Sequence, residues 1–247
     1  MPDPSLPAFI LVGFFAQMID GVLGMAYGVS ATTFLLALGV PPAIASASTH
    51  AAECVTTGLS AASHFGFGNV DKRLVRALLI PGVIGGILGA YILVSIPGDR
   101  MKPFTAAYLL IMGIVILSKA LRRTEHREVT THLIPLGLAG GFFDAIGGGG
   151  WGPIVTGTLL ARGNEPRSAI GSVNFAEFFV TVATSVTFFV TIGFTFWKAI
   201  AGLAIGGAIA APLAAWSTKR ISPRPLLVIV GVVVIALSIR TIWLAIR

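Results

Sequence analysis

The amino-acid sequence predicts an all-α polytopic membrane protein made of two inverted repeats, each with five elements. Three observations predict this fold class. The 247 residues are 55% hydrophobic and only 11% charged, and their mean hydropathy is +0.90, far outside the range of soluble proteins. Apolar segments recur from Ala8 to Ile246, so that a single membrane anchor cannot account for them. Finally, the two halves of the sequence resemble each other.

The apolar segments define ten elements, taken in chain order. A helix needs about 20 residues to cross a hydrocarbon core of about 30 Å. Most of the segments approach or exceed this length, but the second and the seventh have about ten residues each and cannot cross alone. The segments lie at about 8–26, 29–39, 43–64, 74–96, 103–120, 133–147, 153–162, 166–192, 198–216 and 225–246.

The repeat appears when the sequence is shifted by 124 positions against itself. Residues 13–57 then align without a gap to residues 137–181, with 15 identities in 45 positions. Among the matched pairs are Asp20 with Asp144 and Glu53 with Glu177. We therefore expect a first repeat at 1–124 and a second at 125–247, which together form one transmembrane domain.

The number of crossings in each copy predicts that the copies are inverted. Five crossings are odd, and if each short second element forms a re-entrant hairpin with its predecessor, three crossings remain, which is also odd. Each copy is thus a broken helix or re-entrant hairpin followed by three transmembrane helices. Placing both termini outside puts 12 of the 17 basic residues in cytoplasmic loops, as the positive-inside rule favours. These are Lys72, Arg73, Arg76, Lys119, Arg122, Arg123, Arg127, Arg162, Arg167, Lys219, Arg220 and Arg224.

The stretch DAIGGGGWGP at residues 144–153 breaks the helical pattern, as does DGVLGMAYGV at residues 20–29. Irregular backbone in a membrane is tolerated only where protein or a water-filled cavity covers its polar groups. A short helix follows each break, and its first turn offers N–H groups and the positive end of the helix dipole. Two such ends facing one another near the midplane predict an anion site.

The predicted anion contacts come from these breaks, the short helices and the segments that follow them. They are Gly24, Tyr27, Gly28, Ser30, Thr32 and Ser48 in the first half, and Gly148, Gly149, Gly150, Trp151, Gly152, Thr156, Ser172 and Asn174 in the second. The alternative is that these glycines only let helices pack closely. Close packing is the role expected for Gly82, Gly85, Gly86, Gly89, Gly202, Gly206 and Gly207.

A polar stripe runs along the third segment of the first half. Its members, spaced by three or four residues, lie on one face of a helix. They are Ser46, His50, Glu53, Thr57, Ser60 and His64, and the second half repeats part of the stripe with Asn174, Glu177, Thr181 and Thr184. A carboxylate inside a membrane helix is costly and points to function.

Coupling or gating is the role that we expect for Asp20, His50, Glu53, Asp144 and Glu177. Glu53 and Glu177 can gain or lose a proton and so couple proton movement to anion movement, and His50 can share that proton. Two alternatives remain open. The glutamates can simply hydrogen-bond neighbouring helices, and the aspartates either cap the broken backbone or contact the transported species or its coupling ion.

The duplicated motifs DGVLGMAYG and DAIGGGGWG, each followed by a helix with small polar residues, resemble those of the sulfite exporter TauE/SafE-like permeases. The resemblance covers nearly the whole chain. It implies transport of small sulfur-containing anions, such as sulfite, thiosulfate or organosulfonates, across a bacterial cytoplasmic membrane. It does not fix which anion is carried.

The sequence therefore predicts a secondary anion transporter that works by alternating access, with H⁺ or Na⁺ as the coupling ion. No nucleotide-binding loop of the GxxxxGK type is present, and no cofactor, metal or nucleic acid is expected. One alternative is a passive anion channel. Another is an intramembrane hydrolase with Ser30 as nucleophile and His50 or His64 as base, although Ser30 has no serine counterpart in the second half.

Overall fold

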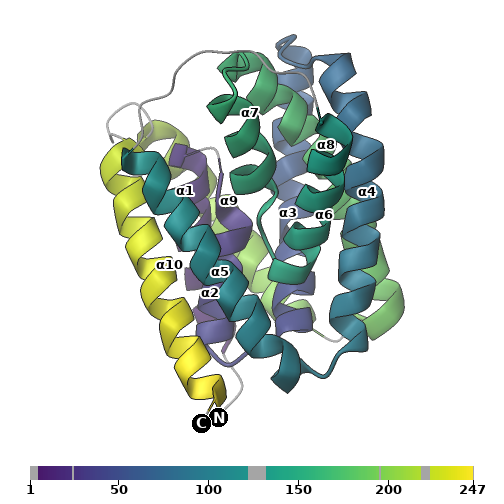
Figure 1. Cartoon of the computed structure of the whole chain (residues 1–247). Coiled ribbons are helices and arrows are strands. Elements are labelled where there is room, and N and C mark those ends of the chain that lie inside the picture. Colours follow the sequence, from purple (N-terminus) through teal and green to yellow (C-terminus); the bar gives the residue numbers. More distant parts are fainter. Residues whose placement is uncertain (1–4, 24, 122–131, 195, 218–222, 247) are drawn as a thin grey trace.

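The computed structural model describes residues 5–23, 25–121, 132–194, 196–217 and 223–246, and within these ranges the structure is helical, without strands. The ten expected segments are all present (Figure 1). The elements are α1 (Leu6–Leu23), α2 (Tyr27–Ala37), α3 (Pro42–Gly66), α4 (Lys72–Ser95), α5 (Gly98–Leu121), α6 (Leu133–Gly147), a π-helical turn η1 (Gly152–Thr156), α7 (Gly157–Ala161), α8 (Pro166–Ile192), α9 (Trp197–Ser217) and α10 (Pro223–Ile246). The seventh segment is thus divided into η1 and α7.

Local sequence explains where the long helices start. Proline occupies the first helical position of α3 and of α8, where the missing N–H costs nothing. The side chain of Asp71 accepts a hydrogen bond from the Arg73 amide at the start of α4, and Glu165 caps α8 in the same way. These starts fix the positions of the long helices relative to the short ones.

The first short helix belongs to a hairpin that turns back on itself. α1 leads away from the end of the molecule where both termini lie, and α2 returns toward it (Figure 1). The return is anchored near the C-terminus, because the Arg240 guanidinium donates to the Ala37 carbonyl at 3.3 Å.

The hairpin made of α6, η1 and α7 turns back in the same way from the opposite end of the molecule (Figure 1). Its first residue, Leu133, and Asn164, which follows its last turn, line one small cavity there. Neither short helix therefore crosses the bundle.

Glycine allows two pairs of helices to pack with their backbones in contact. α1 packs against α9, and α4 packs against α6. A Cβ on Gly206 would lie 2.7 Å from the Phe14 amide nitrogen, and one on Gly141 would lie 2.9 Å from the Gly82 carbonyl carbon. The close-packing role predicted for the glycines of α4 and α9 is confirmed at these contacts.

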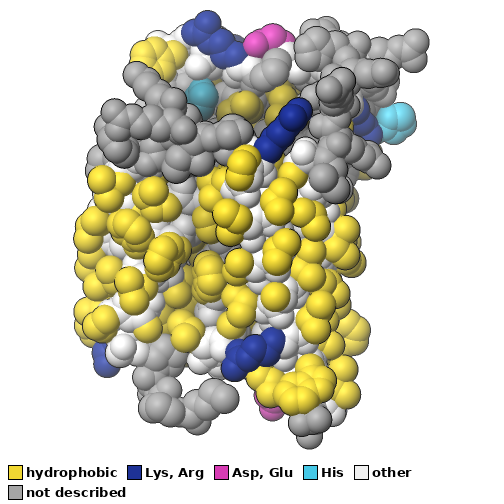
Figure 2. Space-filling view, turned by 90° about the vertical axis from the view of Figure 1, so that its left-hand side faces the viewer, with side chains coloured by type: hydrophobic (Ala, Val, Ile, Leu, Met, Phe, Trp, Pro, Cys, Tyr) yellow, Lys and Arg dark blue, Asp and Glu magenta, His cyan; other side chains and the backbone are white. Residues whose placement is uncertain are grey.

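Apolar side chains cover the middle of the molecule on the face shown in Figure 2, whereas charged side chains lie toward its two ends. Among the described helices, α4 and most of α5, α8 and α10 are long and apolar enough to cross a membrane. The 25-residue α3 is equally long but carries the polar stripe, whose members Ser46, His50, Glu53 and Thr57 are buried inside the bundle. The prediction of an all-helical, multi-pass membrane protein is therefore confirmed.

Candidate transport site

The two breaks meet inside the bundle. The first lies between Leu23 and Tyr27, and the second between Gly147 and Gly152. Their backbones are in contact, because a Cβ on Gly28 would lie 2.6 Å from the Cα of Gly149. Left-handed conformations at Ala26 and Gly148 reverse the chain between the paired helices. The two hairpins, which enter from opposite ends, thus touch at their tips.

An aspartate holds the start of each returning helix. Oδ1 of Asp20 accepts a hydrogen bond from the Tyr27 amide at 3.2 Å, and Oδ1 of Asp144 accepts one from the Trp151 amide at 2.9 Å. In both hairpins the acceptor precedes the donor by seven residues. A carboxylate at this place satisfies a free amide and faces the positive end of the helix dipole. The sequence left open whether these aspartates cap the broken backbone or contact the transported species or its coupling ion. The structure shows the capping contact in both halves.

Hydroxyl groups from the first half hold the second break. Thr32 of α2 donates to the Gly148 carbonyl at 2.5 Å, Ser46 of α3 donates to the Ala145 carbonyl at 2.6 Å, and Tyr108 of α5 donates to the Gly149 carbonyl at 3.0 Å. These bonds satisfy carbonyl groups that α6 can no longer satisfy by itself. The irregular backbone is covered by protein, as the membrane requires.

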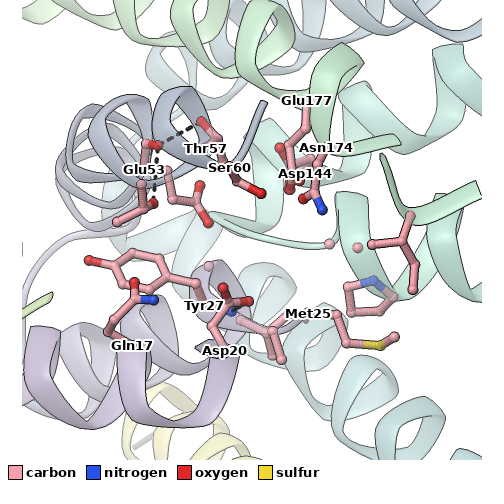
Figure 3. A pocket seen from close by; sticks show the side chains of 18 of the residues that line it. Gln17, Asp20, Met25, Tyr27, Glu53, Thr57, Ser60, Asp144, Asn174 and Glu177 are labelled. Carbon is pink, nitrogen blue, oxygen red and sulfur yellow. Dashed lines mark hydrogen bonds between the residues drawn. The ribbon is translucent and has the colours of Figure 1, made fainter. Parts of the chain in front are cut away.

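A cavity of about 270 Å³ lies beside the joined breaks (Figure 3). Its walls come from α1, α3, α6, η1, α8 and the start of α2. The lining residues are Gln17, Asp20, Met25, Ala26, Tyr27, Gly28, Val29, Glu53, Thr56, Thr57, Ser60, His64, Asp144, Gly150, Gly152, Pro153, Ile170, Asn174 and Glu177.

Four carboxyl groups from four helices line this cavity: Asp20, Glu53, Asp144 and Glu177. They face the same open space (Figure 3). Among the described residues, no lysine or arginine lines it. Like charges repel strongly where water is scarce, so holding all four ionised is costly and protons or a cation reduce that cost.

Lys119 of α5 contacts both breaks. Its ammonium donates to the Pro153 carbonyl at 3.1 Å and lies 3.7 Å from the sulfur of Met25, so it bridges the two breaks just behind the cavity wall. A side chain on Gly157 would meet this ammonium group, so the lysine end would have to move. The sequence pattern placed Lys119 in a loop, but the structure places it within a helix.

His50 of α3 contacts the second break rather than its neighbour Glu53. Nε2 of His50 lies 3.0 Å from Oδ2 of Asp144, and Nδ1 lies 2.8 Å from the Ser46 carbonyl oxygen. The His50 side chain is fully buried. Ser30 lines a separate apolar groove, and among the described hydrogen bonds neither His50 nor His64 pairs with it, so the geometry gives the expected nucleophile no histidine base.

The structure divides the residues singled out in the sequence into two groups. The cavity is lined by Asp20, Tyr27, Gly28, Glu53, Asp144, Gly150, Gly152, Asn174 and Glu177. Outside its lining lie Ser30, Thr32, Ser48, His50, Gly148, Gly149, Trp151, Thr156 and Ser172. Trp151 is buried and its indole donates to the Val173 carbonyl, while Ser172 accepts from the Asp71 amide at the turn between α3 and α4. Gly24 lies outside the described residues.

Sequence reasoning missed several residues of this site. Gln17, Met25 and His64 line the cavity, and Tyr108 and Lys119 support the breaks from α5. His64 lies on the predicted polar stripe, so its helical spacing was a usable signal. No pattern marked Tyr108 or Lys119, because α5 has no polar stripe of its own.

An apolar helical bundle that encloses a polar cavity where two broken helices meet defines a membrane transport protein. The chain belongs to the sulfite exporter TauE/SafE family, whose model matches residues 9–241. It is 44% identical over 254 residues to the probable membrane transporter protein YtnM of Bacillus subtilis, covering 98% of this chain and 85% of that protein. It is 22% identical to the probable membrane transporter protein YjnA of the same organism, covering 95% of this chain and 99% of that protein. It is 26% identical to the probable membrane transporter protein ORF9 of Sinorhizobium, covering 95% of this chain and 92% of that protein. No solved structure matches the chain at a significant level. These names indicate a transporter rather than an enzyme.

Proposed function

We propose that this protein is a secondary transporter that carries small sulfur-containing anions, such as sulfite, thiosulfate or an organosulfonate, by alternating access. The family description supports the class of substrate. The single observation that carries the mechanism is the cavity beside the contact between Gly28 and Gly149, where the tips of two opposed hairpins meet. A site at such a meeting point can be exposed to one side of the membrane and then to the other.

The helix contacts support two inverted repeats, at 1–124 and 125–247, as the moving halves. The pairing of α1 with α9 corresponds to the pairing of α6 with α4 when the halves are exchanged, and α3 packs against its counterpart α8. The exact boundary lies outside the described residues. Rocking of one half against the other changes these paired interfaces while the cavity stays between them.

The positive ends of two helices beside the cavity support an anionic substrate. Gly28, Val29 and Gly152 belong to the first turns of α2 and η1 and line the cavity, and Lys119 adds a full charge behind Pro153. The four carboxyl groups oppose these positive ends unless protons bind to them. The proposed transporter therefore moves its anion together with protons, and an Na⁺ ion is the other candidate for the coupling ion.

The distribution of charge supports a place in the bacterial cytoplasmic membrane with both termini outside. Lys72, Arg73 and Arg167 lie at the end of the molecule opposite the termini, and Arg240 lies at the end with the termini. The first group corresponds to the cytoplasmic loops of the sequence prediction.

Anion flux into liposomes tests proton coupling directly. In the wild type, an imposed gradient of one pH unit, worth about 1.4 kcal/mol per proton, should drive sulfite, thiosulfate or sulfoacetate uptake above the rate without a gradient. Glu53→Gln and Glu177→Gln each remove a carboxyl group that lines the cavity, and we expect both to abolish the acceleration. The matched control is Asp99→Asn, an exposed carboxyl group in the first turn of α5.

Three outcomes would contradict the proposal in different ways. Acceleration unchanged in both glutamine variants removes Glu53 and Glu177 from proton coupling, whereas no acceleration in the wild type removes proton coupling itself and leaves transport intact. Counterflow separates a carrier from a passive channel: a carrier preloaded with unlabelled anion accumulates labelled anion transiently, whereas a channel does not.

A further inference from the structure

The contacts of His50 determine which of its ring nitrogens carries a proton. Nδ1 lies 2.8 Å from the Ser46 carbonyl oxygen, which can only accept a hydrogen bond. The Ser46 hydroxyl lies 3.3 Å from the same nitrogen, but its single hydrogen is donated to the Ala145 carbonyl at 2.6 Å. Neither group of Ser46 can donate to Nδ1, so Nδ1 must be the donor.

The opposite face of the ring then requires a second proton. With Nδ1 protonated, a neutral imidazole presents a lone pair at Nε2, and an ionised Asp144 presents another at Oδ2. These two atoms lie only 3.0 Å apart in a fully buried place, where two facing lone pairs repel. One proton between them removes the repulsion. It gives either an imidazolium with a carboxylate or an imidazole with a carboxylic acid, and the number of protons is the same.

We infer that His50 and Asp144 form a proton-binding site that holds one shared proton between α3 of the first half and the break of the second half. The inference rests on the proposed function and adds a proton-binding pair to the two glutamates, Glu53 and Glu177, that line the same cavity as Asp144. Asp144 lines the cavity and His50 does not, so the proton enters and leaves by way of the carboxyl group.

The site is placed to transmit its protonation state to the second break. The same carboxyl group accepts the Trp151 amide, and the Asp144 carbonyl accepts the Gly149 amide at 2.9 Å. Loss of the shared proton leaves two facing lone pairs between α3 and this turn. The break and α3 are then no longer held together at His50, which is a movement that a transport cycle can use.

Other titratable groups surround the pair. Glu53 of α3, Glu177 of α8 and Tyr108 of α5 interact electrostatically with Asp144, and Asp20 of α1 lies on the same cavity. From α8, the Phe188 ring packs against His50 with ring centroids 6.1 Å apart and contributes no charge. Among the described hydrogen bonds, none of these groups takes the place of His50 at Oδ2 of Asp144.

Among the described residues, the aspartate of the first break has no equivalent partner. Asn174 stands where the repeat would place a histidine, and it lines the cavity, whereas Asp20 has its contact with the Tyr27 amide alone among the described hydrogen bonds. The proton site is therefore asymmetric, and Asp20 provides a matched control for Asp144.

Nitrogen-15 NMR of histidine-labelled protein in lipid nanodiscs tests the site between pH 5 and pH 9. The chain has four histidines, and His50→Asn identifies the His50 signals by their loss. We expect Nδ1 of His50 to stay protonated throughout, while Nε2 changes in one step as the shared proton is lost. Asp144→Asn should abolish that step, because its amide can donate to Nε2 without any added proton. Asp20→Asn should preserve it.

Three results would overturn the inference: a His50 with its proton on Nε2 and none on Nδ1, a step unchanged in Asp144→Asn, or a step lost equally in Asp20→Asn. If Asp144→Asn does not fold, the tautomer of the wild type decides alone. The measurement needs no transported anion. A chain that shows the shared proton but carries no anion would overturn the proposed function and retain this site.

Discussion

Gly149 is the residue on which the contact between the two hairpins depends most directly. Its φ of +149° lies in a region that residues with side chains rarely adopt, and a Cβ there would lie 2.5 Å from the Cα of Gly28. Neither obstacle can be relieved by turning a side chain, since the opposing atoms belong to backbone. A glycine is therefore required at this position for two independent reasons.

Gly149→Ala should destabilise the protein strongly. The backbone conformation alone costs about 1–2 kcal/mol, and separating the hairpin tips adds to it, so we expect the unfolding midpoint in detergent to fall by roughly 5–10 °C. The control is Gly66→Ala at the end of α3, where a Cβ has no neighbour within 4 Å and the midpoint should not fall. Equal midpoints for the two variants would mean that the tips do not touch.

Single residues also mark the limit of what the sequence predicts. The pattern located both aspartates and both glutamates of the cavity, because burial of a carboxyl group in an apolar segment is conspicuous. It paired His50 with Glu53, one turn away, whereas the structure pairs His50 with Asp144, 94 positions along the chain. Helical spacing gives the face of a residue but not the element that this face meets.

At the scale of elements, α5 connects the two hairpins. Tyr108 holds the Gly149 carbonyl, and eleven positions further Lys119 contacts both Met25 and Pro153. The broken segments themselves were predictable, since glycine runs and an aspartate interrupt apolar stretches. The supporting role of α5 was not predictable, because a lysine near the end of an apolar segment is equally compatible with the cytoplasmic loop that follows.

Lys119→Met tests whether this ammonium group attracts the anion. We expect the affinity for the transported anion to fall about tenfold, or ~1.4 kcal/mol, because a positive charge near the cavity is lost. The affinity is measured as the rise in the unfolding midpoint with anion concentration. The midpoint without anion shows separately how much stability is lost with the hydrogen bond to Pro153. Lys119→Arg should retain most of the affinity, and Lys72→Met, at the exposed start of α4, should be silent. Equal affinities in Lys119→Met and the wild type would exclude an electrostatic role.

The whole molecule combines two opposed hairpins with long helices, and this arrangement fixes the positions of the chain ends. Both termini lie at the same end of the bundle, next to the end of α2 and the start of α3 (Figure 1). A chain whose two ends lie on the same side crosses the membrane an even number of times. Each hairpin returns to the side from which it enters, so it adds no crossing. Which side of the membrane receives the termini then depends on charge. Lys72, Arg73, Arg162 and Arg167 all belong to the opposite end, and the positive-inside rule favours the cytoplasm for such a cluster, as proposed above.

Fusion reporters in a bacterial host test the orientation of the whole molecule. Alkaline phosphatase joined after Arg247 should be active, because the enzyme matures only outside the cytoplasm, and green fluorescent protein at the same place should be dark. Inserted after Leu121, at the end with the basic cluster, the two reporters should show the reverse pattern. A fluorescent C-terminal fusion would place the termini inside and invert the assignment of the two hairpins. The α1–α2 hairpin would then enter the membrane from the cytoplasm, and the α6–α7 hairpin from outside.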